Sequence, residues 1–222
     1  MKILVADVET SGFAKTDGVC QLAFIEVNPD LEIIAEWDGL VDPQAPISPG
    51  AQGVHGISDA DVEFAPTMIE LMEEILIPQF GKFDDVLLVA HNSSFDRRFL
   101  APHWGISNTF CTMTASRKVF PNSPDFKLRT LQFYLGLREG IDEAHSAKDD
   151  TAILLLLLKK LIYESEMDLF TLLGYHIKPE KITHMPWGKC KGAPLCDLDA
   201  GYKKWLLALP DLDESLRWSL ES

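Results

Sequence analysis

The stretch Val86-Leu87-Leu88-Val89-Ala90 limits the possible folds more than any other feature of this sequence. Five consecutive apolar residues are typical of a short strand that is buried on both faces of a sheet. A helical pattern follows directly and begins near Ser94. The sequence therefore predicts a βα unit inside a sheet that carries helices on its faces.

Other strand-like segments lie on both sides of this unit. Lys2 to Ala6 is an apolar run that indicates a buried first strand. Val19 to Val27 and Leu31 to Val41 flank the turn residues Asn28-Pro29-Asp30, a pattern that predicts a β-hairpin attached to the first strand. A later short strand is expected at Phe110-Cys111-Thr112.

Helical patterns fill most of the remaining chain. Pro66 opens an amphipathic helix that ends near Phe80 and places on one apolar face the residues Met68, Leu71, Met72, Ile75 and Leu76. Asp42 to Asp61 is rich in Pro, Gly and Ser and predicts an extended surface loop. Further helices are expected at Thr114 to Phe120, Leu128 to Leu137 and Ala147 to Glu164. Early strands followed by alternating strands and helices indicate an α/β domain with a mixed sheet.

A second, smaller part of the chain follows this domain. The helical pattern lapses between Gly174 and Thr183, and a compact segment then runs from Met185 to Gly192. Two helix-like stretches, Tyr202 to Leu209 and Glu214 to Leu220, complete it. We therefore expect a main domain at residues 1–174 and a small C-terminal module at residues 175–222.

The N-terminal segment and the apolar runs indicate where in the cell the protein is located. The segment from Met1 to Asp7 contains an acid and no small-residue cleavage site, so it is a poor signal peptide. The longest apolar run, Ala152 to Leu158, is far too short to cross a bilayer. We expect a cytoplasmic protein that does not contact membranes.

Four cysteines are spread through apolar surroundings and form no C-x-x-C pair. Cys20, Cys111, Cys190 and Cys196 therefore suit reduced thiols better than a disulfide framework. A zinc site that joins Cys190 and Cys196 to His184 is conceivable, although the spacing matches no common zinc pattern.

The formal charge of −14 is unusual for a protein that binds nucleic acid, because lysines and arginines supply most of the affinity for phosphate. A site built from clustered carboxylates, however, requires a divalent metal, which reverses the local field. The cations are also locally grouped, as in the segment from His184 to Lys204, which contains four lysines and two aspartates. Net charge alone therefore leaves nucleic-acid binding open.

The first group of candidate ligands is Asp7-Val8-Glu9, at the end of the first strand. Residues i and i+2 of a strand project from the same face, so both carboxylates can converge on one cation. Triplets of this kind are common by chance, and ordinary acids at a strand end are the alternative.

The second group is His91-Asn92-Ser93-Ser94-Phe95-Asp96, which places Asp96 in the first turns of a helix. An acid there is also favoured because it interacts with the positive end of the helix dipole. The third group, His145-Ser146-Ala147-Lys148-Asp149-Asp150, begins the long apolar helix. Because Ala147, Leu154 and Leu158 define its buried stripe, we expect Asp150 to point towards the sheet and Asp149 outward.

Together these three groups resemble the DEDD exonuclease superfamily in its histidine-containing (DEDDh) branch. The motifs Asp-x-Glu, His-Asn-x-x-Phe-Asp and His-x-Ala-x-x-Asp occur in this order without a substitution, over roughly residues 1 to 165. Ile47-Ser48-Pro49, Val54-His55-Gly56-Ile57-Ser58 and Cys111-Thr112 are typical of relatives of the bacterial replicative proofreading subunit. The resemblance implies a ribonuclease H-like fold, with a mixed five-stranded sheet flanked by helices, and 3′→5′ exonuclease activity.

The tail resembles the small C-terminal module of the exonuclease X family. The similar segments are Met185-Pro186-Trp187-Gly188-Lys189-Cys190-Lys191-Gly192 and Tyr202-Lys203-Lys204-Trp205-Leu206. With them the resemblance covers nearly the whole chain. We take Lys189, Lys191, Lys203 and Lys204 as an accessory contact to nucleic acid. The alternative is that the aromatic residues form the core of the module and the lysines are merely solvated.

The resemblance assigns a role to each motif residue. Asp7, Glu9, Asp96 and Asp150 would hold two Mg²⁺ or Mn²⁺ ions, since clustered carboxylates repel one another without metal and are hard oxygen ligands. His145 would act as the general base, and the product would be a 5′-mononucleotide. Glu9 and the Thr10 backbone would contact the terminal 3′-hydroxyl. The remaining substrate contacts would come from Ser11, Gly12, Phe13, His91 and Asn92.

Three functions agree with these residues. The first is a 3′→5′ exodeoxyribonuclease that acts on single-stranded or duplex DNA ends in repair or proofreading. The second is an RNA-processing exoribonuclease of the same superfamily, which would use the same catalytic residues. The third is a non-catalytic nucleic-acid-binding module, which the presence of all five catalytic positions disfavours.

Overall fold

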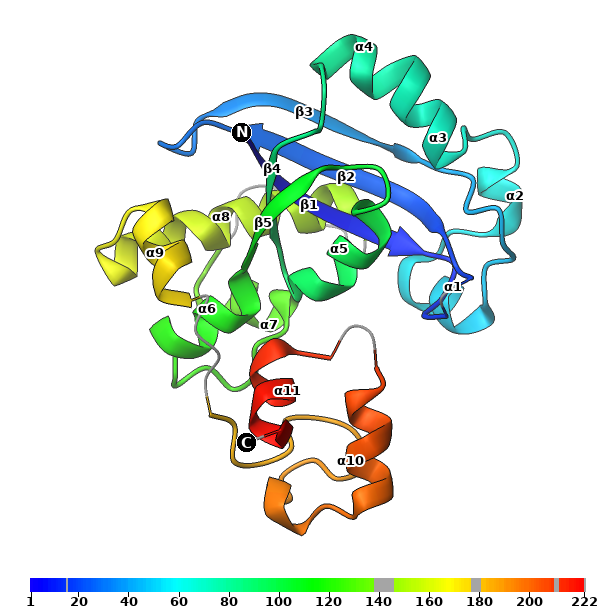
Figure 1. Ribbon diagram of the computed structural model, residues 1–222. Helices are drawn as coiled ribbons and strands as arrows, with labels where there is room; N and C mark the ends of the chain where they lie inside the picture. The colour runs from blue at the N-terminus through cyan, green and yellow to red at the C-terminus, as the bar shows by residue number, and fades with distance from the viewer. Residues whose placement is uncertain (15, 138–145, 177–180, 210–211, 222) are drawn as a thin grey trace. The chain divides into compact units, whose positions relative to one another are not determined.

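The structure is a computed structural model that describes residues 1–222 apart from 15, 138–145, 177–180, 210–211 and 222. The chain divides into two compact units, Met1–Leu172 and Leu173–Ser222. Each unit is described below by itself (Figure 1).

The first unit is built on one mixed sheet of five strands, in the order β3-β2-β1-β4-β5 (Figure 1). The strands are β1 (Lys2–Thr10), β2 (Val19–Val27), β3 (Ile33–Leu40), β4 (Val86–Ala90) and β5 (Ile106–Cys111). The first three strands pair antiparallel, whereas β4 is parallel to β1 and β5 is parallel to β4. The predicted α/β fold with a mixed five-stranded sheet is confirmed.

One face of this sheet packs against the helix that Thr67 caps. This helix runs through α3 (Met68–Glu70), η1 (Leu71–Leu76) and α4 (Ile77–Phe80), and its middle part is wound as a π-helix. Leu71 and Leu76 are fully buried against strand residues, but Ile75 is 37% exposed. The prediction that Ile75 lies on the apolar face was wrong, because the wider π turn rotates it away from the position that 3.6 residues per turn would give.

The other face is covered by α8 (Ala147–Ser165), which packs on β1 and β2. None of its residues belongs to the apolar cluster on the first face, which contains Leu4 and Ala6 of β1. Alternate residues of a strand point to opposite faces, so Ile3 and Val5 lie on the α8 side. Asp7 and Glu9 continue that series and therefore also project on the α8 side.

The segment Asp42 to Asp61, predicted to be an extended loop, instead contains α1 (Pro49–His55) and the start of α2 (Asp59–Val62). Ser48 caps α1 through a hydrogen bond from the Ala51 N–H, and Pro49 occupies a first-turn position. These are ordinary helix-start signals, which the Pro and Gly content of the segment obscured. Three further helices complete this unit: α5 (Ser93–Leu100) packs on β4 and β5, whereas α6 (Thr112–Val119) and α7 (Leu128–Tyr134) pack on α8.

The second unit has a core of its own. Its elements are η2 (Leu195–Asp197), α10 (Ala200–Leu207) and α11 (Glu214–Glu221), and α9 (Leu169–His176) crosses the boundary between the units. The core consists of Met185, Leu195, Leu198, Tyr202, Leu206, Leu212 and Leu216. Arg217 of α11 donates hydrogen bonds to the carbonyls of Leu207 and Leu209, which fixes α11 to the end of α10.

All four cysteines are free thiols. Within the described residues, every helix is too short or too polar to cross a membrane.

Candidate active site

Strand β1 extends beyond the apolar run Lys2 to Ala6 and ends at Thr10, so Asp7 and Glu9 lie in its C-terminal part, as predicted. Val8 between them is buried in the apolar cluster on the opposite face. In the antiparallel pair with β2, Asp7 stands opposite Ala23 and Glu9 stands opposite Gln21. Pairing with β2 therefore places both acidic side chains on the same face of the sheet.

Asp150, in the first turn of α8, joins these two residues. One carboxylate oxygen from each of Asp7, Glu9 and Asp150 lies within 4.8 Å of the others. Asp149 is engaged differently, because its carboxylate accepts a hydrogen bond from the Ser146 hydroxyl at 3.0 Å. Among the described residues this acidic group is the one set suited to a metal, so the conceived zinc site is not formed.

Asp96 reaches the same place from α5 and is only 2% exposed. Because β4 is parallel to β1, the carboxyl ends of both strands share one edge of the sheet, and α5 starts there. Burial raises the pKa of Asp96 to about 7, although backbone N–H groups of Asp96 and Val8 lower it in part. The structure thus brings together all four predicted carboxylates.

The like charges in this cluster oppose one another. Burial raises the pKa of Asp7 well above its usual value, and the charges of Asp96, Glu9 and Asp150 raise it further. Burial also raises the pKa of Glu9 to about 8, with contributions from Asp150 and Asp96. A cluster of carboxylates that resists ionisation in this way fits divalent cations that prefer oxygen ligands.

Gln21 positions the helix that carries Asp150, and sequence reasoning did not identify it. Its Oε1 accepts a hydrogen bond from the N–H of Ala147, the first residue of α8, at 3.2 Å. Since Gln21 stands opposite Glu9, this bond fixes the start of α8 beside the acidic cluster. The available signal was a single amide side chain within the otherwise apolar start of β2.

The residues after Glu9 form a compact loop. Thr10 and Ser11 are buried, and the Ser11 N–H and hydroxyl both bond to the backbone of Gly18. The Thr10 hydroxyl donates to the Gly12 carbonyl at 3.0 Å. The side chains of Thr10 and Ser11 therefore hold the loop in shape.

Phe13, which follows Gly12 in this loop, is 73% exposed, which excludes a core role for its ring. Arg98 of α5 supports it by donating a hydrogen bond from Nη1 to the Phe13 carbonyl at 3.0 Å. The guanidinium also lies 4.4 Å from the ring centroid of Phe99 and 5.6 Å from that of Phe95. Arg98 was also missed in the sequence, because nothing local links it to Phe13.

His55 fixes the end of β1. Its Nδ1 accepts a hydrogen bond from the Ile57 N–H at 3.0 Å, so the proton of the neutral ring resides on Nε2. Nε2 then donates to the carbonyl of Thr10 at 3.2 Å. Burial lowers the pKa of His55, which keeps this neutral form at pH 7.

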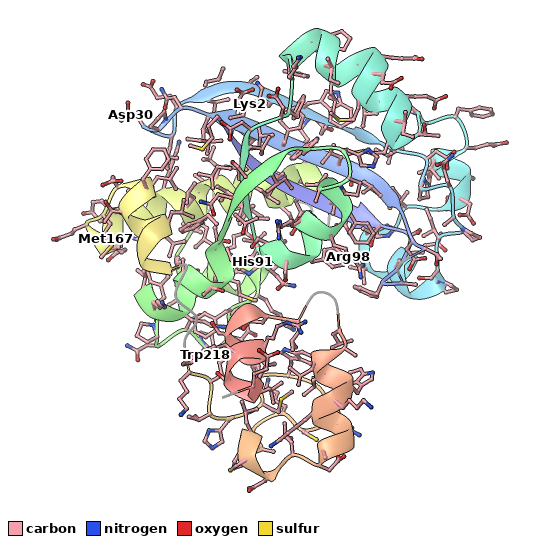
Figure 2. The ribbon with its side chains drawn as sticks, viewed as in Figure 1. Lys2, Asp30, His91, Arg98, Met167 and Trp218 are labelled. Carbon is pink, nitrogen blue, oxygen red and sulfur yellow. The ribbon has the colours of Figure 1, made fainter. Side chains whose placement is uncertain are left out.

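His91 and Asn92, predicted to contact substrate, occupy the turn between β4 and α5. Burial, opposed by a hydrogen bond to Phe126 and assisted by the charge of Arg117, lowers the pKa of His91 to about 4. The neutral ring therefore donates from Nε2 to the Phe126 carbonyl at 2.7 Å and accepts at Nδ1 from the Thr112 hydroxyl at 2.9 Å. Figure 2 labels His91 just before α5. Asn92 has a φ of 67°, in the left-handed region that asparagine tolerates.

The predicted general base, His145, lies outside the residues that the structure describes.

Comparison with known proteins identifies the class. Residues 4–158 match the model of the RNase_T exonuclease family. The chain belongs to this family and is a 3′→5′ exonuclease, as its motifs indicated.

One relative aligns with this chain over almost its full length. The chain is 30% identical to exodeoxyribonuclease 10 of Escherichia coli strain K12, with 98% of this chain and 96% of that protein aligned. The solved structure of exonuclease X in complex with 5′ overhanging duplex DNA matches with a TM-score of 0.62 at 27% identity, covering 78% of this chain and 98% of that one. Escherichia coli exonuclease I in complex with a dA16 oligonucleotide has the same fold, with a TM-score of 0.59 at 19% identity and coverage of 78% and 42%. The predicted resemblance to exonuclease X is confirmed.

Proposed function

We propose that this chain is an exodeoxyribonuclease that releases 5′-mononucleotides from DNA 3′ ends, using two Mg²⁺ or Mn²⁺ ions held by Asp7, Glu9, Asp96 and Asp150. The convergence of carboxylate oxygens from Asp7, Glu9 and Asp150 within 4.8 Å carries this proposal. The activity belongs to residues 1–174, and residues 175–222 form an accessory module. The enzyme is cytoplasmic and acts in repair or proofreading.

The donor set fits the proposed ions. All four side chains offer hard carboxylate oxygens, and burial and mutual repulsion raise the pKa values of Asp7, Glu9 and Asp96. When bound, divalent ions neutralise this repulsion and stabilise the negative charge that develops at the scissile phosphate.

The remaining steps fall to groups of the chain itself. His145 takes the proton of the attacking water, because imidazole is the side chain best suited to exchange protons near neutral pH. Glu9 and the Thr10 backbone contact the terminal 3′-hydroxyl, and His55 orients Thr10 through its carbonyl. Ser11 and Gly12 shape the loop that presents the exposed ring of Phe13 to the last base. His91 and Asn92 set the turn from which Asp96 enters the site.

The relatives of this chain favour DNA as its substrate. The aligned Escherichia coli protein is an exodeoxyribonuclease, and the solved structure at 27% identity holds 5′ overhanging duplex DNA. Single-stranded and duplex DNA 3′ ends are both candidate substrates. The test below distinguishes a DNA substrate from an RNA substrate.

The test is digestion of DNA and RNA of matched sequence, each labelled at the 5′ end, with Mg²⁺, Mn²⁺ or a chelator. We expect a ladder that shortens from the 3′ end, on DNA and only with metal. Preferential digestion of RNA would replace the DNA assignment, and digestion in chelator would contradict the metal mechanism.

A further inference from the structure

The second unit contains an open groove lined by aromatic rings. It has a volume of about 640 Å³ and is lined by Trp187, Gly188, Lys189, Asp199, Gly201, Tyr202 and Trp205. Two segments form it: the loop around Gly188 and the first turns of α10. The groove is therefore built entirely within the C-terminal module.

The exposed rings of this groove are not needed for the module's core. Trp187 is 37% and Trp205 is 50% exposed, and neither belongs to the apolar cluster that holds the unit together. Tyr202 is the one groove aromatic that is part of the core. Large aromatic rings left at the surface in one place indicate a contact with another molecule.

The aromatic rings and the side chain of Lys189 are held in a defined arrangement. Tyr202 and Trp205 stack with their centroids 5.4 Å apart and their planes 14° from parallel. Lys189 Nζ lies 4.5 Å from the Tyr202 ring centroid. Gly188 has a φ of 77°, and a Cβ there would lie 3.1 Å from the Tyr202 hydroxyl, so glycine lets the loop approach the ring closely.

Charge favours an anionic ligand. The acid that lines the groove, Asp199, caps α10 by accepting the Tyr202 N–H at 2.9 Å, and the helix dipole offsets its charge. The segment from His184 to Lys204 contains four lysines and two aspartates, so cations outnumber acids in this part of an otherwise acidic chain.

We propose that this groove binds single-stranded DNA, with a base on the open ring of Trp205 or Trp187 and the adjoining phosphate at Lys189. Unpaired bases expose the aromatic faces that such rings require, whereas the bases of a duplex already stack on one another. A base on Trp205 extends the existing Tyr202–Trp205 stack. This inference rests on the proposed function, because the bound strand would be the substrate of the nuclease.

The test measures binding without catalysis. The full chain is titrated with 5′-fluorescein-labelled oligo(dT) in chelator, and anisotropy is recorded at several KCl concentrations. At least one of Trp205→Ala and Trp187→Ala should weaken binding by about 5-fold to 150-fold, the range for losing one base stack. Lys189→Ala should reduce the salt slope by about 0.7, the value for one phosphate contact of a single strand.

Matched controls lie in the same unit. Trp218 is 42% exposed but does not line the groove, and Lys204 is a lysine outside it. Trp218→Ala should bind as the wild type does, and Lys204→Ala should lose less affinity than Lys189→Ala. Trp205→Phe keeps an aromatic ring and should retain most of the affinity. Unchanged binding in both Trp187→Ala and Trp205→Ala would overturn the proposal and leave a protein ligand for the groove.

A second readout separates this inference from the proposed function. The p-nitrophenyl ester of thymidine 5′-monophosphate is too small to require the groove, so Trp205→Ala should hydrolyse it with unchanged kcat and KM. Loss of that activity in Trp205→Ala would also overturn the proposal. Failure of the wild type to cleave any substrate, with oligo(dT) binding intact, would instead count against the proposed function alone.

Discussion

The two units of this chain hold their functional groups in opposite ways. In the first unit, four carboxylates are gathered at one sheet edge, where burial and repulsion raise the pKa values of Asp7, Glu9 and Asp96. In the second unit, the core is complete without Trp187 and Trp205, whose rings remain at the surface. A catalytic site can thus hold carboxylates whose mutual repulsion is relieved only when a ligand binds. A binding groove can instead leave its aromatic rings exposed to solvent at little cost to folding.

The largest expected effect is at Asp150. Asp150→Ala should lower metal-dependent turnover by roughly 10⁴-fold or more, ~5 kcal/mol of transition-state stabilisation, because it removes one of the carboxylates proposed to hold the ions. The measurement is single-turnover digestion of a labelled strand. Asp149→Ala is the control, since Asp149 bonds to Ser146 instead. Equal losses in the two variants would show that the wrong aspartate was chosen.

His145→Ala should lower turnover by about 10²-fold to 10⁴-fold, the usual range for the loss of a general base. Metal affinity, measured by Mn²⁺ titration, should be mostly retained, because a base acts on the proton rather than on the ion. The acidic limb of the pH–rate profile should also change. An unaltered limb in the variant would assign that titration to another group.

Gln21→Ala tests whether the acidic site depends on the placement of α8. Loss of the hydrogen bond to Ala147 should weaken Mn²⁺ binding by roughly 10-fold to 100-fold, as is usual for groups that orient metal ligands. Lys148→Ala is the control near the same helix end, because it removes only an exposed ion pair with Asp38. If both variants bind Mn²⁺ equally well, Gln21 does not position the site.

The metal-free protein should become less stable as the pH rises. A carboxyl whose pKa is raised by folding stabilises the folded state below its unfolded pKa, near 4, and this stability is lost as the pH rises through the folded value. For Asp96 and Glu9 the folded values are about 7 and about 8. Thermal unfolding in chelator should therefore give a Tm that falls between pH 5 and 8, by roughly 2–4 °C for each kcal/mol lost. Mn²⁺ should restore the Tm, and Asp96→Asn should flatten the slope.

The smallest expected effect is on the stability of the second unit. Trp205→Ala should lower the free energy of unfolding by about 1 kcal/mol or less, because the ring is outside the core and loses mainly its contact with Tyr202. Its neighbour Leu206 is fully buried, and Leu206→Ala should cost about 2–5 kcal/mol. Urea denaturation of both variants measures the difference. Similar losses would mean that Trp205 supports the core and would remove the contrast between the units.

Much of the first unit follows from its sequence alone. The predicted bounds of β2 and β4 equal those in the structure, because turn residues and an unbroken apolar run define strand ends locally. The convergence of Asp7 and Glu9 on one face follows from the two-residue period of a strand. Motif order then indicated that Asp96 and Asp150 would join them.

What the sequence concealed depends on contacts between distant segments. The sequence did not reveal the π turn that exposes Ile75, and the Pro and Gly content of the segment hid the caps of α1. Helix α9 was not predicted, because most of it lies between the predicted helix that ends at Glu164 and the lapse that begins at Gly174. Gln21 and Arg98 act on residues far away in the chain, and neither carries a local signature of that role.

The hydrogen bond between Gln21 and Ala147 joins residues that are 126 positions apart. Strand β1 must also pair with β4 before the part of the sheet that carries the acidic cluster is complete. Contacts of such long range form slowly, because the entropy of closing large loops opposes them. The hairpin of β2 and β3 can form early from neighbouring residues, but the acidic cluster cannot. During refolding, regular secondary structure should therefore appear first, and the capacity to bind metal should be among the last properties to return.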